Sequence, residues 1–337
     1  MANIRDVAEL AEVSIAAVSR ILSCDPAYRA TERTKNAVFE AAAKLNYSVK
    51  PSYRKNPAES KKKTISCIIN LTSEKHDDSF YTAILEGLKL ELSKHNYTVE
   101  YIKSQYDIGN IENLRTLLKP PTKGLILMTT PTDDSYEIIK QHGVHVVGID
   151  TSLSDIDNVR YNRFEAGCNA MQYLIENGHK KIAFVGSYIP NKFALTFGRY
   201  DAYHTMMRRY QLPVNSDWTI DCLWQRQLCY DYTVKLINLK DRPTAIFFAS
   251  DYMAMASLSA MYANKVKVPD DISIIGISNI DEAKYLNPPL TTIAIPQKEI
   301  GQIAAITLLS RINGDTTVPK QIYVPTNLVV RSTVKKI

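Results

Sequence analysis

Apolar and polar positions follow two different patterns along the chain. In residues 4–45, apolar residues recur every three or four positions, which is the period of a helix with one buried face. From Thr64 onward, short apolar runs such as TISCII, GLILM and VHVVGID alternate with stretches of helical period. Strands that alternate with helices predict parallel sheets covered on both faces, and two such series, before and after Arg160, predict two lobes. The pattern therefore predicts a small helical module followed by a two-lobed α/β body.

The front module is expected to contain three short helices. Asn3 is placed to cap the first helix, which ends near Ala11, Ser14 to cap the second, and Thr31 to cap the third. Three short helices with so tight a first turn are typical of a helix-turn-helix unit. The apolar positions expected to form its core are Ile4, Val7, Ala8, Ala11, Val18, Ile21, Leu22, Val38, Ala41, Ala42 and Leu45.

The second helix carries the candidate DNA contacts. On the predicted geometry, Ser14 and Ser19 are available to donate to phosphates, Ile15 and Ala16 suit thymine methyl groups, and Arg20 suits a bidentate contact with guanine. The alternative is a structural three-helix cap with an arginine on its surface. Helical spacing alone does not decide between the two.

Charge is concentrated at the front of the chain. Residues 1–63 contain twelve Lys or Arg against seven Asp or Glu residues, 12 − 7 = +5, whereas the remaining 29 and 28 give only +1 of the total +6. This asymmetry favours a front module that faces phosphates. The segment SVKPSYRKNPAESKKKT, which begins at Ser48, is rich in Lys, Pro and Ser and lacks apolar periodicity, so it is predicted to be a linker.

Composition excludes several classes of protein. No apolar run approaches the roughly 20 residues that span a bilayer, and no short apolar core of a signal peptide is present at the front, so we expect a cytoplasmic protein without a membrane partner. No GxGxxG or GxxxxGK[ST] loop occurs, so the sequence does not support binding of a dinucleotide or a nucleoside triphosphate. Neither a cofactor nor a metal is expected, because the five cysteines contain no CxxC pair and His142 and His145 do not form a metal motif.

Polar and aromatic residues that follow predicted strands mark a candidate ligand site in the body. Ligands of such sheets bind beyond the carboxyl ends of the strands, and in a two-lobed body they bind between the lobes. Carboxylate and guanidinium groups bond to sugar hydroxyls, and an aromatic face stacks on a sugar ring. For each residue, the alternative is a helix cap or a loop anchor, which is the preferred interpretation of Asp251. The candidates are Asp150, Arg199, Trp224, Ser250 and Ser278.

The stretches IRDVAELAEVSIAAVSRIL and TERTKNAVFEAAAKLNY closely resemble the DNA-binding headpiece of the lac repressor/galactose repressor family of bacterial transcription regulators. IAFVG, FGRYDAY, FFASDYMAM, VPDDISIIGIS and NPPLTTI are similar to that family's periplasmic-binding-protein-like effector domain, so the resemblance covers essentially the whole chain. It implies that Ile15, Ala16 and Arg20 contact operator bases, and it adds Phe80 and Tyr81 to the effector site. DDSFYTAILEGL is similar to the corresponding segment of β-galactoside-responsive members.

The chain departs from the family pattern at three places. Glu12 stands where glycine is common in the turn. Asn56 and Pro57 stand where a leucine is expected to wedge into the minor groove. We expect either that Tyr53 replaces this wedge, or that Arg54, Lys55 and Lys61 to Lys63 hold the DNA backbone by charge alone. Ser250 and Ser278 occupy positions where lac-type sites commonly carry Asn and Asp.

The expected organisation follows from these observations. Residues 1–47 form the helix-turn-helix headpiece, 48–63 the hinge, and 64–337 the effector-binding and dimerisation domain. Its first lobe is expected over about 64–160 and 292–322, and its second over about 161–291 and 323–337.

The expected function is that of a homodimeric repressor, not an enzyme. It would bind pseudo-palindromic operator DNA and repress genes for the use of galactose or β-galactosides until a small sugar effector binds between the lobes. An alternative of the same fold is a regulator that depends on a corepressor or a phosphocarrier protein. The alternatives outside regulation are a cytoplasmic sugar-binding protein and a hydrolase.

Overall fold

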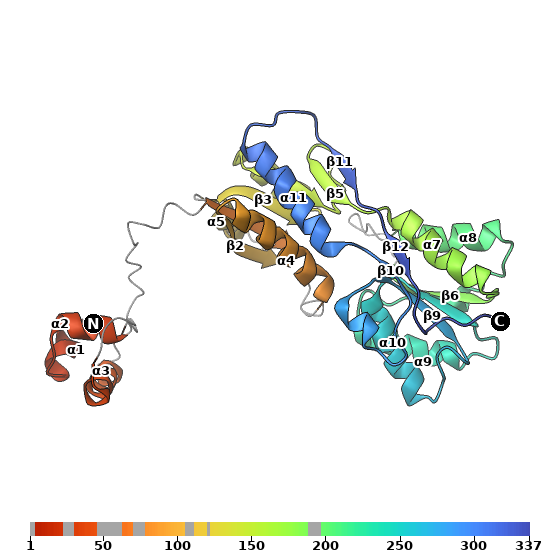
Figure 1. Cartoon of the computed structure of the whole chain (residues 1–337), viewed down its shortest axis with the longest axis horizontal. Helices are drawn as coiled ribbons and strands as arrows, with labels where there is room; N and C mark the ends of the chain where they lie inside the picture. Colours follow the sequence, from red (N-terminus) through yellow and green to blue (C-terminus); the bar gives the residue numbers. More distant parts are fainter. Residues whose placement is uncertain are drawn as a thin grey trace. The chain divides into compact units, whose positions relative to one another are not determined.

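The computed structural model describes residues 4–22, 30–45, 63–69, 78–104, 111–119, 122–187 and 197–337. The chain divides into two compact units, Met1–Lys61 and Lys62–Ile337. Each unit is described by itself (Figure 1).

The first unit contains three helices around a small apolar core. They are α1 (Ile4–Leu10), α2 (Ile15–Leu22) and α3 (Glu32–Lys44). Their shared core consists of Val7, Ala8, Ala11, Val18, Ile21, Val38, Ala41 and Ala42. This confirms the predicted helix-turn-helix fold and its apolar positions, except for the side chain of Leu22, which lies outside what the structure describes.

Two of the predicted helix caps are present. The Ser14 Oγ accepts a hydrogen bond from the Ala17 N–H at 3.2 Å, and the Thr31 Oγ1 accepts one from the Thr34 N–H at 3.2 Å. Each satisfies an amide that the first turn of its helix leaves without a partner. The third predicted cap, Asn3, lies outside the described residues.

The turn between α1 and α2 accommodates a residue other than glycine in the left-handed region. Glu12 has φ 51°, a conformation that disfavours residues with a Cβ atom. The departure from glycine at this position therefore leaves the turn in place and introduces local backbone strain.

The second unit is built on two six-stranded sheets. Their strand orders are β11-β5-β4-β3-β1-β2 and β12-β10-β9-β8-β6-β7, and every pairing is parallel except that of β10 with β12. The first sheet contains β1 (Lys63–Ile69), β2 (Tyr97–Ser104), β3 (Thr122–Met128), β4 (His145–Ile149), β5 (Asp157–Arg160) and β11 (Gln321–Tyr323). The second contains β6 (Ile182–Gly186), β7 (Thr219–Asp221), β8 (Ala245–Phe248), β9 (Ser273–Ser278), β10 (Thr292–Ala294) and β12 (Asn327–Val329).

Helices cover both sheets, as expected for parallel strands. The first lobe comprises the first sheet with α4 (Ser79–Lys94), α5 (Ile111–Leu118), α6 (Asp133–Gln141) and α11 (Gln297–Ile312). The second lobe comprises the second sheet with α7 (Arg163–Glu176), α8 (Phe197–Arg209), α9 (Arg226–Ile237), α10 (Asp251–Ala263) and two 3-10 turns, η2 (Ser216–Trp218) and η3 (Asp281–Lys284). The predicted two-lobed α/β architecture is therefore confirmed.

Helices α4 and α11 lie side by side because glycines allow their backbones to approach (Figure 1). A Cβ atom at Gly87 would lie 2.0 Å from the carbonyl oxygen of Lys298, and one at Gly301 would lie 2.1 Å from that of Ile84. Any other residue would force the helices apart.

The end of the chain completes both sheets. After β10 the chain enters α11 and adds β11 to the first sheet, then returns to add β12 to the second. The predicted lobe boundary differs here, because Thr292 pairs with Gly276 of β9, so β10 belongs to the second lobe and the return to the first begins after it. Within the described ranges, no helix is both long and apolar enough to cross a membrane.

A buried ion pair joins α11 to the start of β5. The Arg311 guanidinium contacts both carboxylate oxygens of Asp157, at 2.6 and 2.8 Å, and the Lys320 N–H donates to the same carboxylate at 2.7 Å. Burial raises the pKa of Asp157, but these hydrogen bonds outweigh burial and lower it below 3.8.

We predict that Asp157→Asn lowers the free energy of unfolding by about 2–3 kcal/mol at neutral pH, because it leaves the buried guanidinium with only the longer contact to Asp315, at 3.6 Å, as an ion pair. Since the folded pKa lies below that of the unfolded chain, the contribution is complete above about pH 4 and is lost as the pH falls through the folded pKa. Urea unfolding at several pH values measures both effects. The control is Glu112→Gln, which removes an exposed pair with Arg115 and should change stability by less than about 1 kcal/mol; equal losses in the two variants would contradict the account.

Candidate functional site

Helix α2 exposes all five side chains that the sequence assigned to DNA. Its other face is buried through Ala17, Val18 and Ile21. The exposed set is Ser14, Ile15, Ala16, Ser19 and Arg20. The remaining predicted DNA contacts, Tyr53, Arg54 and Lys55, lie outside the described residues.

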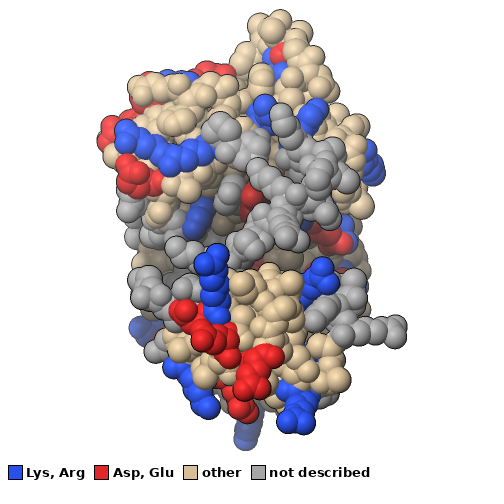
Figure 2. Space-filling model, turned by 90° about the vertical axis from the view of Figure 1, so that its left-hand side faces the viewer, with Lys and Arg blue, Asp and Glu red and all other residues tan. Residues whose placement is uncertain are grey.

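The positive charge of the front segment does not come from the described helices. Residues 4–22 and 30–45 contain five Lys or Arg and five Asp or Glu residues, 5 − 5 = 0, whereas residues 46–63 contain six and one, 6 − 1 = +5. Figure 2 shows Lys and Arg interspersed with Asp and Glu over the described surface in that view. The net charge that attracts phosphates therefore lies in the linker sequence.

The carboxyl ends of the strands bring polar residues of the two lobes together. Asp150 follows β4 and Tyr161 follows β5 in the first lobe, while Trp224 and Ser250 follow β7 and β8 in the second. The group formed by Tyr81, Asp150, Tyr161, Arg163, Arg199 and Trp224 is called the interlobe site below.

Arg199 lies at the centre of the interlobe site and is only 8% exposed. Its Nη1 donates to the carbonyl oxygen of Ala249 at 2.7 Å, and its Nη2 donates to the Tyr161 hydroxyl. The guanidinium carbon lies 5.7 Å from the ring centre of Tyr161 and 5.9 Å from that of Trp224. Leu223 and Trp224 both have positive φ, 49° and 61°, in the turn after β7. This strained backbone holds the Trp224 ring beside the Arg199 guanidinium.

Asp150 forms an ion pair with Arg163, the first residue of α7. Because Asp150 follows a strand of the first sheet and α7 packs on the second, the pair bridges the lobes. Tyr81 of α4 lies beside this pair: burial and the nearby Asp78 raise the pKa of its hydroxyl, Arg163 lowers it, and Asp150 raises it. The predicted residues Tyr81 and Asp150 are thus brought together.

The other predicted effector residues have different surroundings. Phe80 packs against Tyr81 in an edge-to-face contact, with 5.3 Å between the ring centres. Ser250 caps α10, because its Oγ accepts from the Met253 N–H at 3.3 Å. Ser278 is buried, with φ 136°, and its carbonyl oxygen accepts a hydrogen bond from the Gln297 side chain.

Asp251 does not cap α10, contrary to the preferred sequence interpretation, because Ser250 does. Its buried carboxylate accepts hydrogen bonds from the Ile280 N–H at 3.1 Å and the Thr292 hydroxyl at 2.6 Å. Burial raises the pKa of Asp251 to about 6, against the opposing effect of these donors. Asp251 therefore anchors the loop that follows β9.

A second bridge between the lobes lies at the start of α4. The Ser79 Oγ donates to the Glu282 Oε2 of η3 at 2.8 Å. Sequence reasoning missed this bridge, along with Tyr161 and Arg163. Tyr161 and Arg163 follow β5, a four-residue strand that the apolar pattern did not predict, so no local signal marked them.

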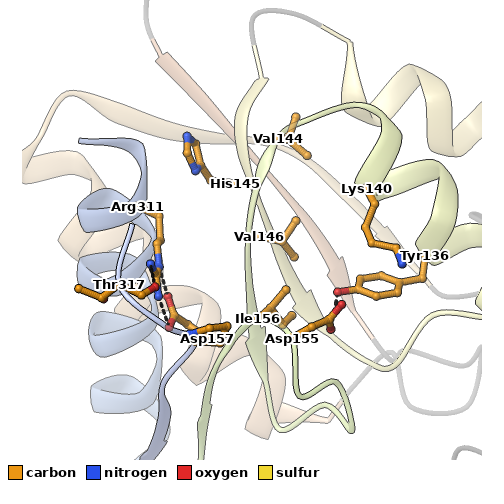
Figure 3. Close-up of a pocket in the computed structure, with 11 residues that line it drawn as sticks. Tyr136, Lys140, Val144, His145, Val146, Asp155, Ile156, Asp157, Arg311 and Thr317 are labelled. Carbon is orange, nitrogen blue, oxygen red and sulfur yellow. Dashed lines mark hydrogen bonds and ion pairs between the residues drawn. The ribbon is translucent and has the colours of Figure 1, made fainter. Parts of the chain in front are cut away.

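A hollow of about 350 Å³ lies elsewhere in the first lobe, near the amino ends of β4 and β5. Figure 3 shows two polar pairs in its lining: Arg311 faces Asp157, and the Tyr136 hydroxyl donates to Asp155 at 2.7 Å. Its lining residues are Tyr136, Lys140, Val144, His145, Val146, Asp155, Ile156, Asp157, Arg311, Thr317 and Pro319.

The candidate histidines do not come together as a metal site. The His142 Nδ1–H donates to the Ile138 carbonyl oxygen at 2.8 Å, at the end of α6. In the part of the chain that the structure describes, no three His, Cys, Asp or Glu residues are grouped to hold a metal ion.

Comparison with known proteins decides the family. Residues 3–50 match the model of bacterial regulatory proteins of the lacI family, and residues 171–334 match that of the periplasmic binding protein-like domain. The transcriptional repressor PurR of Actinobacillus pleuropneumoniae serotype 3 (strain JL03) is 32% identical, and the alignment covers 100% of this chain and 99% of that protein. The chain belongs to the lacI family of bacterial regulatory proteins. It is a DNA-binding transcriptional regulator, and its family is one of regulators rather than enzymes.

Other relatives extend the comparison. The probable repressor ExuR of Bacillus subtilis (strain 168) is 28% identical, over 100% of this chain and 99% of its own. A lacI family regulator from Enterococcus faecium, solved with bound ribose, has a TM-score of 0.72 and 27% identity over 82% of this chain and 100% of that one. The structure of a CelR–cellobiose complex, at 23% identity and a TM-score of 0.73, covers 99% of this chain and 100% of that one, and supports the fold alone. These relatives support the predicted family but not its galactose-responsive branch.

We predict that Asp150→Asn lowers the free energy of unfolding of the body by about 1–3 kcal/mol, because the ion pair that it breaks is only 19% and 23% exposed. The matched control is Glu137→Gln, whose pair with Lys140 is 45% and 60% exposed and should contribute little. Urea unfolding monitored by circular dichroism measures both variants. Unchanged stability in Asp150→Asn would show that the bridge does not hold the lobes.

Proposed function

We propose that the chain is a repressor that binds operator DNA through α2 and responds to a small sugar-type effector at the interlobe site. The DNA-binding role is carried by one observation: the capped helix α2 buries one face in the three-helix core and exposes the other, with Ser14, Ile15, Ala16, Ser19 and Arg20 on it. Such a helix fits the major groove with its amino-terminal residues toward the base edges. Two relatives named as repressors, PurR and ExuR, support the sign of regulation.

A homodimer is the proposed form that binds DNA. One headpiece presents a single long polar side chain, Arg20, among the five exposed residues of its reading surface, which is little for a unique site. Two copies related by a two-fold axis would double that surface and match a pseudo-palindromic operator.

The sugar class of the effector is supported by the chemistry of the interlobe site. Asp150 offers carboxylate acceptors for hydroxyl groups, and Trp224 offers a ring face for the apolar side of a sugar. A related regulator binds ribose in its structure. Support for a galactoside within this class comes from the segment DDSFYTAILEGL, because it resembles the corresponding segment of β-galactoside-responsive members. The segment contains Ser79 and Tyr81.

Binding of the effector is proposed to reach DNA through the relative position of the two lobes. The ion pair of Asp150 with Arg163 and the hydrogen bond of Ser79 with Glu282 each join one lobe to the other. A ligand that changes these bridges shifts an equilibrium between lobe positions, which is a hinge mechanism of allosteric coupling. Release from the operator is the proposed response, and tighter binding would indicate a corepressor instead.

We predict that Arg20→Ala weakens binding to the specific operator by about 10-fold to 150-fold, because it removes a bidentate contact with guanine. Fluorescence anisotropy of the full chain with DNA from upstream of its own gene measures this affinity. A scrambled duplex of the same length and composition is the control, and its weaker binding should change little. An equal loss on both duplexes would make Arg20 a phosphate contact, and no specific binding by the unaltered chain would contradict the proposal.

We also predict that replacing Lys61, Lys62 and Lys63 together with serine reduces the slope of log affinity against log salt by about 2 to 3. Each phosphate that a lysine neutralises contributes about 0.9 to that slope. Anisotropy titrations between 50 and 200 mM salt measure it for any duplex. A triple replacement of Lys119, Lys123 and Lys140 in the body is the matched control, and an unchanged slope in the linker variant would locate the phosphate contacts elsewhere.

A further inference from the structure

The charge of Arg199 lacks a counter-ion within the described structure. Its hydrogen-bond acceptors are the neutral carbonyl of Ala249 and the neutral hydroxyl of Tyr161, and its Nε is buried without any hydrogen-bond partner. Among the residues that the structure describes, no Asp or Glu carboxylate forms an ion pair with it. A guanidinium on a buried residue, paired only with neutral groups, is an energetically unfavourable arrangement.

Two other arginines of the body provide the contrast. Arg163, with a side chain 19% exposed, is paired with Asp150, and Arg311, with a side chain 13% exposed, is paired with Asp157. Both are more exposed than Arg199, yet both have a carboxylate partner. Burial without a carboxylate is therefore a property of Arg199 and not of the fold's arginines in general.

The neighbouring groups leave a positive charge at the interlobe site. Arg163 already neutralises Asp150, and the nearby Asp78 carboxylate accepts the Phe80 N–H at the start of α4, so neither carboxylate forms an ion pair with Arg199. The rings of Tyr161 and Trp224 flank the guanidinium of Arg199 and stabilise it through their faces, but they carry no charge. A neutral sugar would leave this charge uncompensated, whereas a ligand with one anionic group would neutralise it.

We infer that the effector is an acidic sugar, whose oxyanion pairs with Arg199 while its hydroxyl groups bond to Asp150 and its ring lies against Trp224. The inference rests on the proposed function and names the ligand class for the same site. The anion is a carboxylate, as in a uronic or aldonic acid, or a phosphate ester. A carboxylate matches the fork of the guanidinium and offers an acceptor to the unpartnered Nε–H.

The test compares sugars that differ only in the acidic group. Isothermal titration calorimetry of the full chain with D-galacturonate and D-galactose isolates a carboxylate at C6, and D-glucuronate with D-glucose repeats the comparison for a second sugar. D-Galactose 6-phosphate distinguishes a phosphate from a carboxylate. We expect one acidic member to bind about 10-fold to 150-fold more tightly than its neutral counterpart, which is the range for a hydrogen bond to a charged group.

The variants assign that preference to Arg199. Arg199→Gln should reduce the ratio of acidic to neutral affinity to near one. Arg208→Gln removes the same charge from an exposed position in the last turn of the same helix and should leave the ratio unchanged. Circular dichroism checks that both variants fold. If Arg199→Gln does not fold, the comparison of sugars on the unaltered chain still tests the inference.

Acetate provides a probe that is independent of the sugar. At equal ionic strength, acetate in place of chloride should raise the melting temperature of the unaltered chain and not that of Arg199→Gln. If this occurs while no sugar binds, the anion site stands and the sugar class of the proposed function is wrong. The inference is overturned if a neutral sugar binds as tightly as its acid, or if neither acid sugars nor acetate show an effect that depends on Arg199.

Discussion

A guanidinium withdrawn from water must find partners for its charge and its N–H groups, and this constraint governs the junction between the two lobes. Arg199 satisfies it only in part, through the Ala249 carbonyl at the end of β8 and the Tyr161 hydroxyl that follows β5. These two contacts connect the carboxyl end of β8 in one lobe to the segment that follows β5 in the other. Trp224, held on strained backbone, lies beside the same guanidinium.

The topology makes the junction a meeting point of the whole body. Both sheets need a strand from the last segment of the chain, β11 in one and β12 in the other, so neither lobe is built from one continuous stretch. The lobes are further joined by the ion pair of Asp150 with Arg163 and the hydrogen bond of Ser79 with Glu282. Small changes at these few bonds are the means by which the proposed effector would alter the relation between the lobes.

Local patterns predicted much of this structure. Helix caps such as Ser14 and Thr31 depend on residues three positions apart, and the alternation of apolar runs depends on one element at a time, so both were visible in the sequence. The three-residue strand β10 was assigned to the wrong lobe because so short a strand carries little periodicity, and only its pairing with β9 places it.

The composition of the candidate site was less accessible from sequence. Asp150 and Arg199 were recognised as polar residues near strand or helix ends, but their partners are set by the tertiary fold. Ser79 and Glu282 are 203 positions apart, and nothing local links them. Ser250 left both interpretations open, because a residue after a strand also precedes the next helix, and in this chain its hydroxyl caps that helix.

The central claim is that the interlobe site and α2 are coupled, and reciprocal binding tests it most directly. Operator affinity of the full chain is measured with and without saturating D-galacturonate, and the affinity for D-galacturonate is measured with and without operator. Linkage requires the same factor in both directions, and the account predicts weaker operator binding by about 5-fold to 150-fold. A factor of one, with both ligands bound, would show that the two sites act independently and would contradict the account.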